Sequence, residues 1–595
     1  MKKETVRIGC AAGFWGDTET AAPQLVAHGN IDYLVFDYLA EVTMSILARA
    51  RAKDPTAGWA KDFVDVVMRQ VLRDVASKKI KVVANAGGVN SRACRDALVK
   101  LAEEIGVKIR VAIVEGDDLL ERAPAYAQAG LREMDGEGVL PRKLWSMNAY
   151  LGAVPIAAAL AQGADIVITG RCVDSAVVLG PLMHEFGWRS TDYGALAAGS
   201  LAGHILECGT QATGGTFTDW DTVEGWDTMG FPIAEVQPDG SFVVTKPPNT
   251  GGLVNEATVG EQILYEIGDP RSYILPDVVC DFTRVELKQV GPDRVLVTGA
   301  MGYPPTAAYK VSATYQDGFR ATSIFTMVGF NAVTKIRRVC ETILARTRMI
   351  FRQNGWPDFR RTAIRILGTE DIYGAHANPL LLQSRELVGR MDVHHDDRRA
   401  LEVWASEIAP SGTGMAPGRL QLVGGRPAVT PMVRLFSCLV PKEDVRVIVD
   451  FEDKRMDVPA TIPADPFVTP SVPQACPTPP SVAGARTVML IKLAYGRSGD
   501  KGDSANIAVI ARKPEFLPII REQLTESRVA EWFAHLVEGP VARYEVPGLR
   551  AVNFVLQRAL DGGGAASLRP DTQGKSYAQL LLTMPIEVPP GLEVS

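Results

Sequence analysis

No stretch of about 18 apolar residues occurs in the chain, so we expect no segment that crosses a membrane. Long runs of lysine or arginine are also absent, and the formal net charge is −6, which argues against a nucleic-acid partner. The first residues turn polar and glycine-rich at GFWGD, before an apolar signal core of useful length can form. Together these absences predict a cytoplasmic protein.

The motifs of several common cofactor sites are missing too. There is no GxGxxG fingerprint, no P-loop (GxxxxGKS/T) and no GxSxG elbow, which argues against NAD chemistry, ATP hydrolysis and a hydrolase serine. The eight cysteines have no CxxC or other metal-like spacing, and we expect most of them to be reduced and buried. We therefore expect no bound metal and no cofactor.

One histidine pair could suggest a metal site. His394 and His395 are adjacent, and three acidic residues flank them: Asp392, Asp396 and Asp397. Ligand pairs on one helix face normally stand three or four residues apart, so we prefer a solvated acidic turn before a helix that begins near Arg398.

The length and composition indicate several folded parts. At 595 residues the chain is too long for one hydrophobic core, because single cores stop growing at about 250 to 300 residues. Its 46% hydrophobic and 22% charged residues lie in the globular range. We expect an α/β domain over residues 1–257, an α+β region over 258–455, a proline-rich linker over 456–486 and a small α+β domain over 487–595.

The N-terminal third alternates short apolar runs with stretches long enough for crossover helices. Each run is nearly continuous in Val, Ile and Leu, as in strands that are buried on both faces. This alternation predicts a doubly wound, mostly parallel sheet with helices on both sides. The predicted strands are Val6–Ala11, Tyr33–Phe36, Lys81–Ala84, Arg110–Val114 and Asp165–Thr169.

A polar or glycine-rich loop follows each predicted strand. In open α/β sheets, ligands bind outside the carboxyl ends of the strands. The five loops should therefore share one crevice, which we expect to be the active site. The loops are GFWGD (13–17), DYLAE (37–41), NAGGVN (85–90), EGDD (115–118) and GRCVDS (170–175).

From about Thr258 to Phe451 the pattern changes to longer, antiparallel-looking strands, with a strong helical pattern over Asn331–Arg352. Tyr309–Thr314 and Ala321–Val328, joined through YQDGF, predict a β-hairpin. The sequence leaves open whether this region is a second domain or an elaboration of the first.

Eight prolines lie between Pro459 and Pro480, which prevents helix and disfavours a central strand. Beyond this linker, strand and helix patterns outline a module of about 100 residues, long enough to fold independently. It carries two glycine-bearing loops, RSGDKGD (497–503) and DGGG (561–564).

Several of these motifs together resemble one family. VRIGCAAGFWGDT, DYLVFDYLAE, VVANAGGVN, ITGRCVDSA and GSLAGHILECGTQATGG are similar to the N-terminal domain of the acyclic terpene utilisation (AtuA) family, and AYGRSGDKGDSANIAVIA is similar to its C-terminal ferredoxin-like domain. The resemblance covers roughly residues 5–455 and 487–587. It implies these folds and a role beside acyl-CoA carboxylases, dehydrogenases and hydratases in the degradation of terpenoid or branched acids. It implies no particular reaction.

Carboxylates dominate the second and fifth loops. Asp37 and Glu41 follow a buried strand, where charge is costly unless it has a partner or a catalytic task. A carboxyl group near other acids, such as Asp174, can have a raised pKa and serve as general acid or base. One that faces Arg171 stays charged and orients a substrate. A structural ion-pair network remains the alternative.

The first and third loops are candidate binding elements. Gly13 and Asp17 could form a tight turn that lines the ligand, although a phosphate-binding turn and simple structural punctuation are alternatives. In the third loop, main-chain N–H groups and side-chain amides could hold a carbonyl or carboxylate oxygen. The alternative there is a turn with a helix cap. The third-loop candidates are Asn85, Gly87, Gly88 and Asn90. We expect the change of Asn85 to Ala to abolish ligand stabilisation and to leave the melting temperature of the free protein nearly unchanged.

Two further candidates lie in GHILECG. His204 and Glu207 stand three residues apart and share a helix face, which suits acid–base work, although a lone histidine on an apolar helix is more often a core residue. Ser175 in the fifth loop completes the expected binding residues of the N-terminal domain.

The RSGDKGD segment packs two cations, two carboxylates and two glycines into seven residues, which suits an anionic ligand. If so, Arg497 or Lys501 should face the crevice, either in the same chain or in a neighbouring subunit of a homo-oligomer. A solvated turn with local ion pairs is the alternative.

These features favour an enzyme that acts on a branched carboxylic acid or its CoA thioester, by addition or elimination next to a carbonyl. Such a hydratase or lyase needs no cofactor, and CoA would enter only as part of the substrate. The alternative is a non-catalytic protein that binds acyl-CoA or another metabolite and assembles with carboxylase or hydratase subunits.

Overall fold

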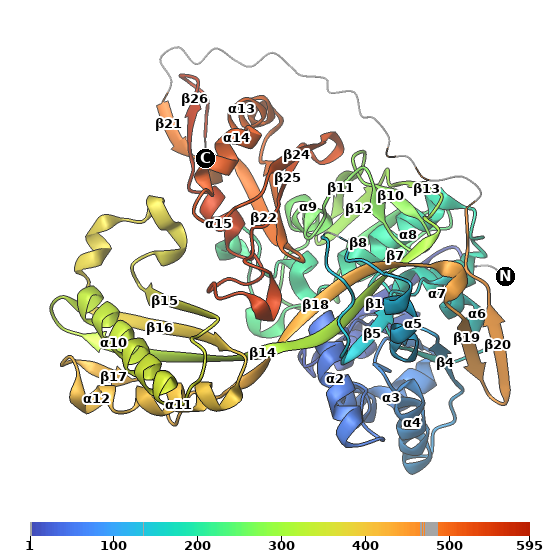
Figure 1. The fold of residues 1–595 in the computed structure, drawn as a ribbon. Helices are drawn as coiled ribbons and strands as arrows, with labels where there is room; N and C mark the ends of the chain where they lie inside the picture. Colours follow the sequence, from blue (N-terminus) through green and yellow to red (C-terminus); the bar gives the residue numbers. More distant parts are fainter. Residues whose placement is uncertain (1–2, 135, 464–466, 468, 470–485, 595) are drawn as a thin grey trace.

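A computed structural model describes residues 3–134, 136–463, 467, 469 and 486–594 (Figure 1). Its largest element is an eleven-stranded mixed sheet with the strand order β11-β12-β8-β7-β1-β2-β3-β6-β4-β19-β20. The central strands β1, β2, β3, β6 and β4 run parallel, whereas the strands on both sides of them pair antiparallel. The five parallel strands are β1 (Val6–Cys10), β2 (Tyr33–Phe36), β3 (Lys81–Ala84), β4 (Val111–Glu115) and β6 (Ile166–Thr169).

Helices cover both faces of the parallel strands. Alternate strand residues enter two different cores: Leu34 and Phe36 pack with α1, α3 and α4, whereas Tyr33 and Val35 pack with α6, α7 and α8. The doubly wound α/β fold is therefore confirmed. The helices are α1 (Ala21–His28), α2 (Glu41–Lys53), α3 (Arg69–Lys78), α4 (Ser91–Ile105), α5 (Ala123–Gln128), α6 (Val154–Ala161), α7 (Ala176–Phe186), α8 (Tyr193–Leu206) and α9 (Glu256–Leu264).

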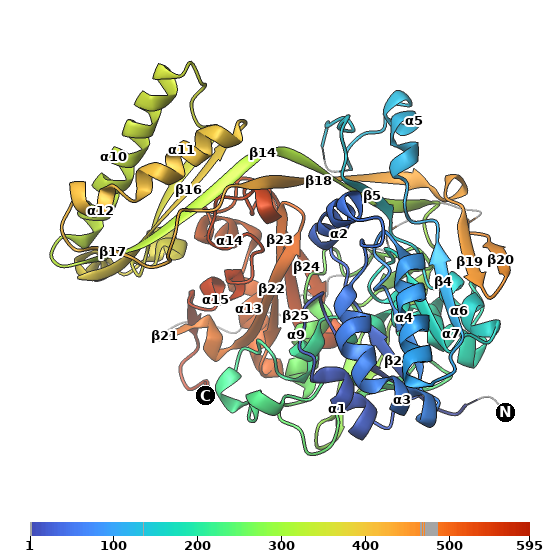
Figure 2. The same ribbon diagram turned by 90° about the horizontal axis from the view of Figure 1, so that it is seen from below.

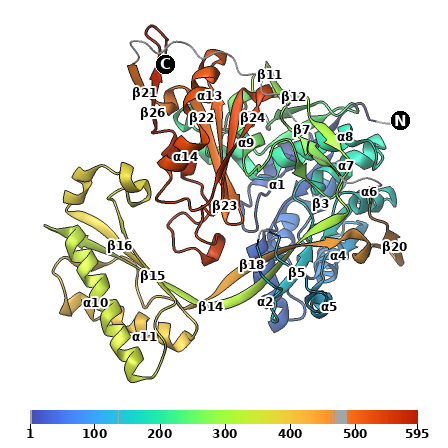
Figure 3. The same ribbon diagram turned by 45° about the horizontal axis from the view of Figure 1, so that its top comes forward.

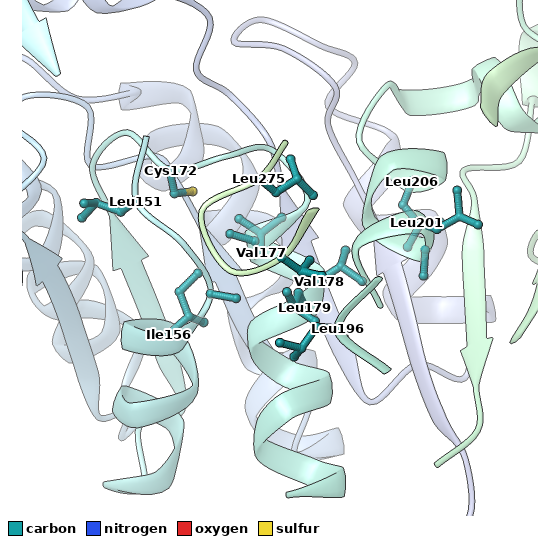
Figure 4. Packing of buried hydrophobic residues seen from close by; sticks show 14 of the residues in the cluster. Leu151, Ile156, Cys172, Val177, Val178, Leu179, Leu196, Leu201, Leu206 and Leu275 are labelled. Carbon is teal, nitrogen blue, oxygen red and sulfur yellow. The ribbon is translucent and has the colours of Figure 1, made fainter. Parts of the chain in front are cut away.

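The core beneath α7 and α8 is the largest in the molecule. Val177, Val178 and Leu179 of α7 lie close to Leu196 of α8 (Figure 4). Gly203 brings α8 against the start of α7, since a Cβ there would meet Ser175 at 2.7 Å. This packing fixes the end of α8 next to the fifth loop, which follows β6.

Strands from the middle of the chain extend the parallel sheet at both edges. The sheet is consequently mixed, with the predicted parallel strands at its centre. The added strands are β7 (Ile233–Val236), β8 (Phe242–Thr245), β11 (Glu286–Gly291), β12 (Arg294–Thr298), β19 (Val447–Phe451) and β20 (Lys454–Val458). A separate small sheet consists of β9 (Tyr273–Ile274), β10 (Val279–Asp281) and β13 (Met301–Tyr303).

The hairpin predicted between Tyr309 and Val328 is wrong. Residues Ala308–Val328 form one 21-residue strand, β14, that continues through the DG dipeptide with an irregularity between Gln316 and Phe319. The chain stays extended because it has strand partners before and after the dipeptide. Its first part pairs with β5 (Ser146–Ala149) and β18 (Thr430–Pro441), and its second part pairs with β16 (Glu386–His395).

The second half of β14 carries an arm that projects from the rest of the molecule (Figures 1 and 2). Helices α10 (Ala332–Gln353) and α11 (Arg398–Ile408) cover one face of the arm sheet and form its own hydrophobic core. The predicted helix over Asn331–Arg352 is confirmed. The remaining arm elements are β15 (Arg361–Leu367), β17 (Arg419–Gln421) and α12 (Ser411–Gly414).

The C-terminal module has a four-stranded antiparallel sheet with the order β22-β23-β25-β24 and a core of its own. Residues 497–501 of the predicted RSGDKGD loop belong to strand β22, so only Gly502 and Asp503 form the turn. The elements are β21 (Arg486–Met489), β22 (Ala494–Lys501), β23 (Ser504–Ala511), α13 (Leu517–Gln523), α14 (Glu526–Trp532), β24 (Val541–Val546), β25 (Ala551–Leu556), α15 (Tyr577–Leu581) and β26 (Pro585–Val588).

The module docks on the N-terminal part of the same chain and lies between that part and the arm (Figures 1 and 3). Its fully buried Asn506 donates to the carbonyl of Leu264 at the end of α9, and Asn553 donates to the carbonyl of Ile267. Buried amides that bond across two parts of a chain make this docking specific. Most of the predicted proline-rich segment lies outside the described residues.

Within the described residues, no helix is long and apolar enough to cross a membrane. The seven cysteines that the structure describes are all free, and six of them are buried.

Candidate functional site

The loops after β2 and β3 meet at the carboxyl edge of the parallel strands. Asn85 is completely buried there and bonds in two directions: its Nδ2 donates to Asp37 Oδ1 at 2.5 Å, and its Oδ1 accepts from the main-chain nitrogen of Tyr38 at 2.6 Å. Asp37 is buried as well. The side chain of Asn85 thus positions Asp37, and its full burial keeps it from direct contact with a ligand outside the loop.

Arg171, after β6, is the centre of the site. Its Nη1 donates to Asp174 Oδ1 at 2.6 Å, and its guanidinium lies 4.2 Å from the centre of the Tyr150 ring. Tyr150 in turn donates its hydroxyl hydrogen to Glu41 at the start of α2. Lys310 of β14 lies 3.8 Å from Glu41 and approaches the same ring. One buried arginine therefore links residues from four segments.

Two carboxyl groups beside Arg171 are shifted in opposite directions. Burial raises the pKa of Asp37, the negative charge of Asp174 raises it further, and Arg171 only partly offsets both. Burial also disfavours the charged form of Glu41, but the positive charges of Lys310 and Arg171 and the Tyr150 hydrogen bond lower its pKa to about 2. These opposite pKa shifts allow Asp37 to hold a proton while Glu41 stays charged.

Asp117, which follows β4, joins this cluster although the sequence did not single it out as a site residue. Its Oδ2 accepts from the main-chain nitrogen of Arg171 and from Asn148, each at 2.9 Å. Burial raises its pKa to about 7. A Cβ at Gly170 would lie 2.3 Å from this carboxylate, so glycine is required there for Asp117 to approach. Asp117 therefore positions the loop that carries Arg171.

His204 and Glu207 form a buried pair at the end of α8. His204 Nε2 lies 3.1 Å from the carbonyl oxygen of Ile263, which can only accept, so Nε2 carries a hydrogen. His204 Nδ1 lies 3.0 Å from Glu207 Oε1, and a hydrogen bond there needs a second hydrogen. The pair thus holds one proton, either as imidazolium and carboxylate or as imidazole and carboxylic acid. Burial raises the pKa of Glu207, and the charge of nearby Asp174 adds to this effect.

The C-terminal module brings further charged groups to this place. The positive charge of Lys501 lowers the pKa of Glu207, and its ammonium lies 5.7 Å from the centre of the Tyr273 ring. Burial and the charges of Glu266 and Glu41 raise the pKa of Asp500 to about 6. Asp500 and Lys501 therefore lie close to carboxylates of the N-terminal part, and they do so within the same chain.

Arg497 has a different role. Its Nη1 donates to the main-chain oxygen of Thr216 at 2.8 Å, its Nη2 donates to Gln211, and its guanidinium covers the ring of Tyr265 at 4.8 Å. The side chain is nearly buried by these contacts. Arg497 thus attaches the module to the N-terminal part, and Lys501 is the cation of this strand that reaches the carboxyl cluster.

Gly13 and Asp17 shape the first loop. Asp17 Oδ2 accepts from the main-chain nitrogen of Gly13 at 3.0 Å, which closes the turn. A Cβ at Gly13 would lie 2.8 Å from the main chain of Cys208 and Gly209. Glycine therefore lets the first loop approach the segment that follows Glu207.

The remaining predicted binding residues lie in close packing. Gly87 donates its N–H to the Thr169 carbonyl, and a Cβ on it would lie 2.6 Å from that oxygen. Gly88 has a positive φ of 54°. Asn90 Oδ1 caps α4 by accepting from Ala93, and its Nδ2 donates to the carbonyls of Pro55 and Ala57, in the segment after α2. Ser175 is buried at the start of α7. These contacts favour positioning of the loops rather than direct ligand contact.

A small cavity of about 10 Å³ lies beside Arg171, with room for about one water molecule. Arg171 Nε, Asn148 Oδ1 and Ser312 Oγ are buried without a hydrogen-bond partner among the described residues. The lining residues are Glu41, Met44, Ser146, Asn148, Arg171, Ser312 and Thr314.

The described residues contain no group of three His, Cys, Asp or Glu side chains that could hold a metal ion. The predicted solvated turn at His394–His395 is wrong, because both histidines are buried at the end of strand β16. His395 instead accepts from the main-chain nitrogen of Asp397 at 2.8 Å, just before α11, and the helix does begin at Arg398 as predicted.

Some residues of the cluster gave little or no signal in the sequence. Asp117 stands in the fourth loop and could have been chosen on the same grounds as Asp37. Tyr150 directly follows β5 and Lys310 lies on β14, both in another sheet, and Asp500 was one of several charges in its segment. Only the three-dimensional arrangement brings Asp117, Tyr150 and Lys310 to Arg171 and Glu41, and Asp500 to the charges around Glu41.

Fold and site together define an α/β protein in which carboxyl groups gather at the edge of a parallel sheet beside a docked C-terminal module. The chain belongs to the acyclic terpene utilisation family: the model of "Acyclic terpene utilisation family protein AtuA" matches residues 6–451. The "AtuA ferredoxin-like domain" matches residues 488–587. The family resemblance and the ferredoxin-like module are thereby confirmed. Family membership suggests involvement in acyclic terpene utilisation. Neither a curated protein nor a solved structure matches the chain.

Proposed function

We propose that the protein is a cofactor-independent hydratase or lyase that acts on a branched carboxylic acid or its CoA thioester. The observation that carries this proposal is the position of the Asp37 and Asp174 carboxyl groups beside Arg171. The negative charge of Asp174 raises the pKa of Asp37, on which burial already acts in the same direction. A carboxyl group that keeps its proton next to an accessible carboxylate offers an acid and a base in one place.

The Asp37 and Asp174 side chains differ in their exposure to solvent. The Asp174 side chain is 36% exposed, whereas Asp37 is buried. Asp174 can therefore meet a substrate, and its ion pair with Arg171 fixes its direction. Because like charges close together disfavour double ionisation, the pair favours a state with one proton.

In the elimination direction, Asp174 removes the proton from the carbon next to the carbonyl. The C–H electron pair forms the double bond, the C–O bond breaks, and the leaving hydroxyl departs as water with the proton of Asp37. The site ends with its proton on Asp174 in place of Asp37, so its net charge is unchanged. Transfer of this proton from Asp174 back to Asp37 returns the two carboxyls to their starting states.

Two kinds of residue support this chemistry. Glu41, with its lowered pKa, stays charged and holds Tyr150 and Arg171 in place. Lys501, at the exposed end of β22, supplies a cation that can attract the carboxylate or thioester end of the substrate.

The test begins with a thermal-shift screen of CoA, acyl-CoAs and free branched acids, followed by mass spectrometry of each stabilising compound after incubation with the protein. A gain or loss of one water in the compound supports a hydratase, and cleavage supports another lyase. Asp37→Asn should still bind but should not convert the compound, since an amide cannot release the proton. Asp165→Asn, at the opposite end of β6, is the matched control and should convert it normally.

Stabilisation of the parent protein without conversion of any compound would instead favour the non-catalytic alternative, in which the protein binds acyl-CoA or another metabolite for partner subunits. The full burial of Asn85, which bonds to Asp37 and to the Tyr38 main chain, and the close packing of the third loop are the observations that favour this alternative.

A further inference from the structure

A second cavity lies far from the carboxyl cluster in sequence, between the arm and the C-terminal module. Its volume is about 460 Å³, which is in the range of small-molecule sites. Residues of β15 form one wall, and residues of the module form the other. The lining residues are Arg361, Thr362, Ala363, Arg365, Asp371, Gly374, His535, Leu536, Asp561, Leu568 and Arg569.

The wall on the arm is the polar face of a two-faced sheet. One face, which includes Phe325, Met391 and Val393, packs under α10 and α11. On the other face, cross-strand neighbours form polar rows, because side chains alternate along each strand. One row contains Arg361, His394 and Arg320. Two rows further along the same face, Arg365 and Arg390 are neighbours. Figure 3 shows this sheet between its helices and the C-terminal module.

Contacts between the arm and the module enclose the cavity. At one side the His376 ring stacks on Trp532 with centroids 3.6 Å apart, and His535 lies 2.9 Å from the Ile372 carbonyl oxygen. At the other side Arg320 donates to the main-chain oxygen of Ala565 at 2.7 Å. The glycine-rich DGGG segment, which the carboxyl cluster does not use, supplies part of the wall through Asp561.

The charges around the cavity do not cancel. Three arginines and two aspartates line it, and the strand neighbours Arg320, Arg390 and Asp392 add one more positive charge, so two positive charges are in excess although Arg361 is paired with Asp561. Arg365 Nε is buried without a hydrogen-bond partner among the described residues, and Arg365 Nη1 lies 3.4 Å from Asp371. Arg569 Nη1 donates to the main-chain oxygen of Leu536. The arginines are Arg320, Arg361, Arg365, Arg390 and Arg569, and the aspartates are Asp371, Asp392 and Asp561.

We propose that this cavity binds a small phosphate monoester, with the phosphate group at Arg361 and Arg365. Paired guanidinium groups recognise phosphate through two parallel hydrogen bonds, and a phosphate monoester carries close to two negative charges at neutral pH. The charge of the ligand thus matches the excess on the walls. The apolar side chains of Ala363, Leu536 and Leu568 would contact its organic part. This site is independent of the proposed function.

The test is isothermal titration calorimetry of the full chain at constant ionic strength, with inorganic phosphate, glycerol 3-phosphate and glycerate as probes. We expect saturable binding of glycerol 3-phosphate, weaker binding of phosphate and no binding of glycerate. Arg365→Gln should weaken binding by at least about tenfold, as expected for the loss of a charge-assisted hydrogen bond. Arg398→Gln, on the exposed start of α11, is the matched control and should bind like the parent.

Ala363→Phe provides a test that leaves every charge in place, because the larger side chain fills the cavity. It should abolish binding even if Arg365→Gln folds poorly. The proposal is overturned if glycerol 3-phosphate does not bind the parent protein, if glycerate binds equally well, or if Ala363→Phe binds with unchanged affinity.

Discussion

The change of Asn85 to Ala is the clearest probe of how the site is built. The amide of Asn85 makes two short hydrogen bonds in a completely buried place, to Asp37 Oδ1 and from the Tyr38 main chain. Its removal leaves a buried N–H of Tyr38 without an acceptor, at a cost of about 1–3 kcal/mol, and takes a donor from Asp37 at a similar cost. We therefore expect a loss of about 3–5 kcal/mol in the free energy of unfolding once the small cavity is included.

Asn354→Ala is the matched control, since Asn354 is an exposed residue at the end of α10 with one local hydrogen bond. It should change stability by less than about 0.5 kcal/mol. Differential scanning calorimetry compares the two variants, and hydrogen exchange over residues 33–41 and 82–90 locates the effect. Equal stability of Asn85→Ala and Asn354→Ala would refute this account of the site and would restore the expectation from sequence, in which Asn85 acts only on a ligand.

Three further changes test other parts of the structure. Asp117→Asn should gain stability relative to the parent as pH rises from about 5 to 8, by roughly 1–4 kcal/mol, because the parent must ionise a buried carboxyl whose pKa is raised to about 7. Urea unfolding at several pH values measures the difference in unfolding free energy between the two proteins. A difference that does not change with pH would argue against the raised pKa. Gly13→Ala should cost about 1–3 kcal/mol in thermal unfolding, whereas Gly194→Ala, with open space around its Cβ, should cost nothing; similar values for both would show that the first loop is not tightly packed. Arg497→Gln should speed hydrogen exchange in β22 and β23 and leave the arm unchanged, and unaltered exchange would contradict its role in docking on Tyr265.

The central parallel strands could be predicted from sequence because their physical signal is local. Each strand is a short, mostly apolar run that a polar or glycine-rich loop follows. Residues such as Val35 and Val83 are buried, as expected for strands that helices cover on both faces. The long strand β14 could not be predicted. An Asp-Gly pair between two apolar runs favours a hairpin locally, and only pairing with three distant strands keeps the chain extended there.

The candidate site, like the fold, could be predicted only in part from the sequence. Asp37, Asp174 and Glu207 follow strands or helices whose ends the sequence locates, so their approach follows from the topology. The partners that decide their protonation come from elsewhere. Lys310 lies on β14, which the sequence placed in a hairpin, and Asp500 reaches the site only because the C-terminal module docks on the same chain.

Deuterium exchange tests the central claim most directly, because removal of a proton next to a carbonyl does not require the full reaction. A saturated branched acyl-CoA that stabilises the protein is incubated in D₂O, and mass spectrometry follows the uptake of deuterium. The account predicts uptake with the parent protein and with Asp165→Asn, and loss of uptake with Asp174→Asn, which has no carboxylate to act as base. Binding without uptake by the parent protein, or equal uptake by Asp174→Asn, would contradict the assignment of this carboxyl cluster as a proton-transfer site.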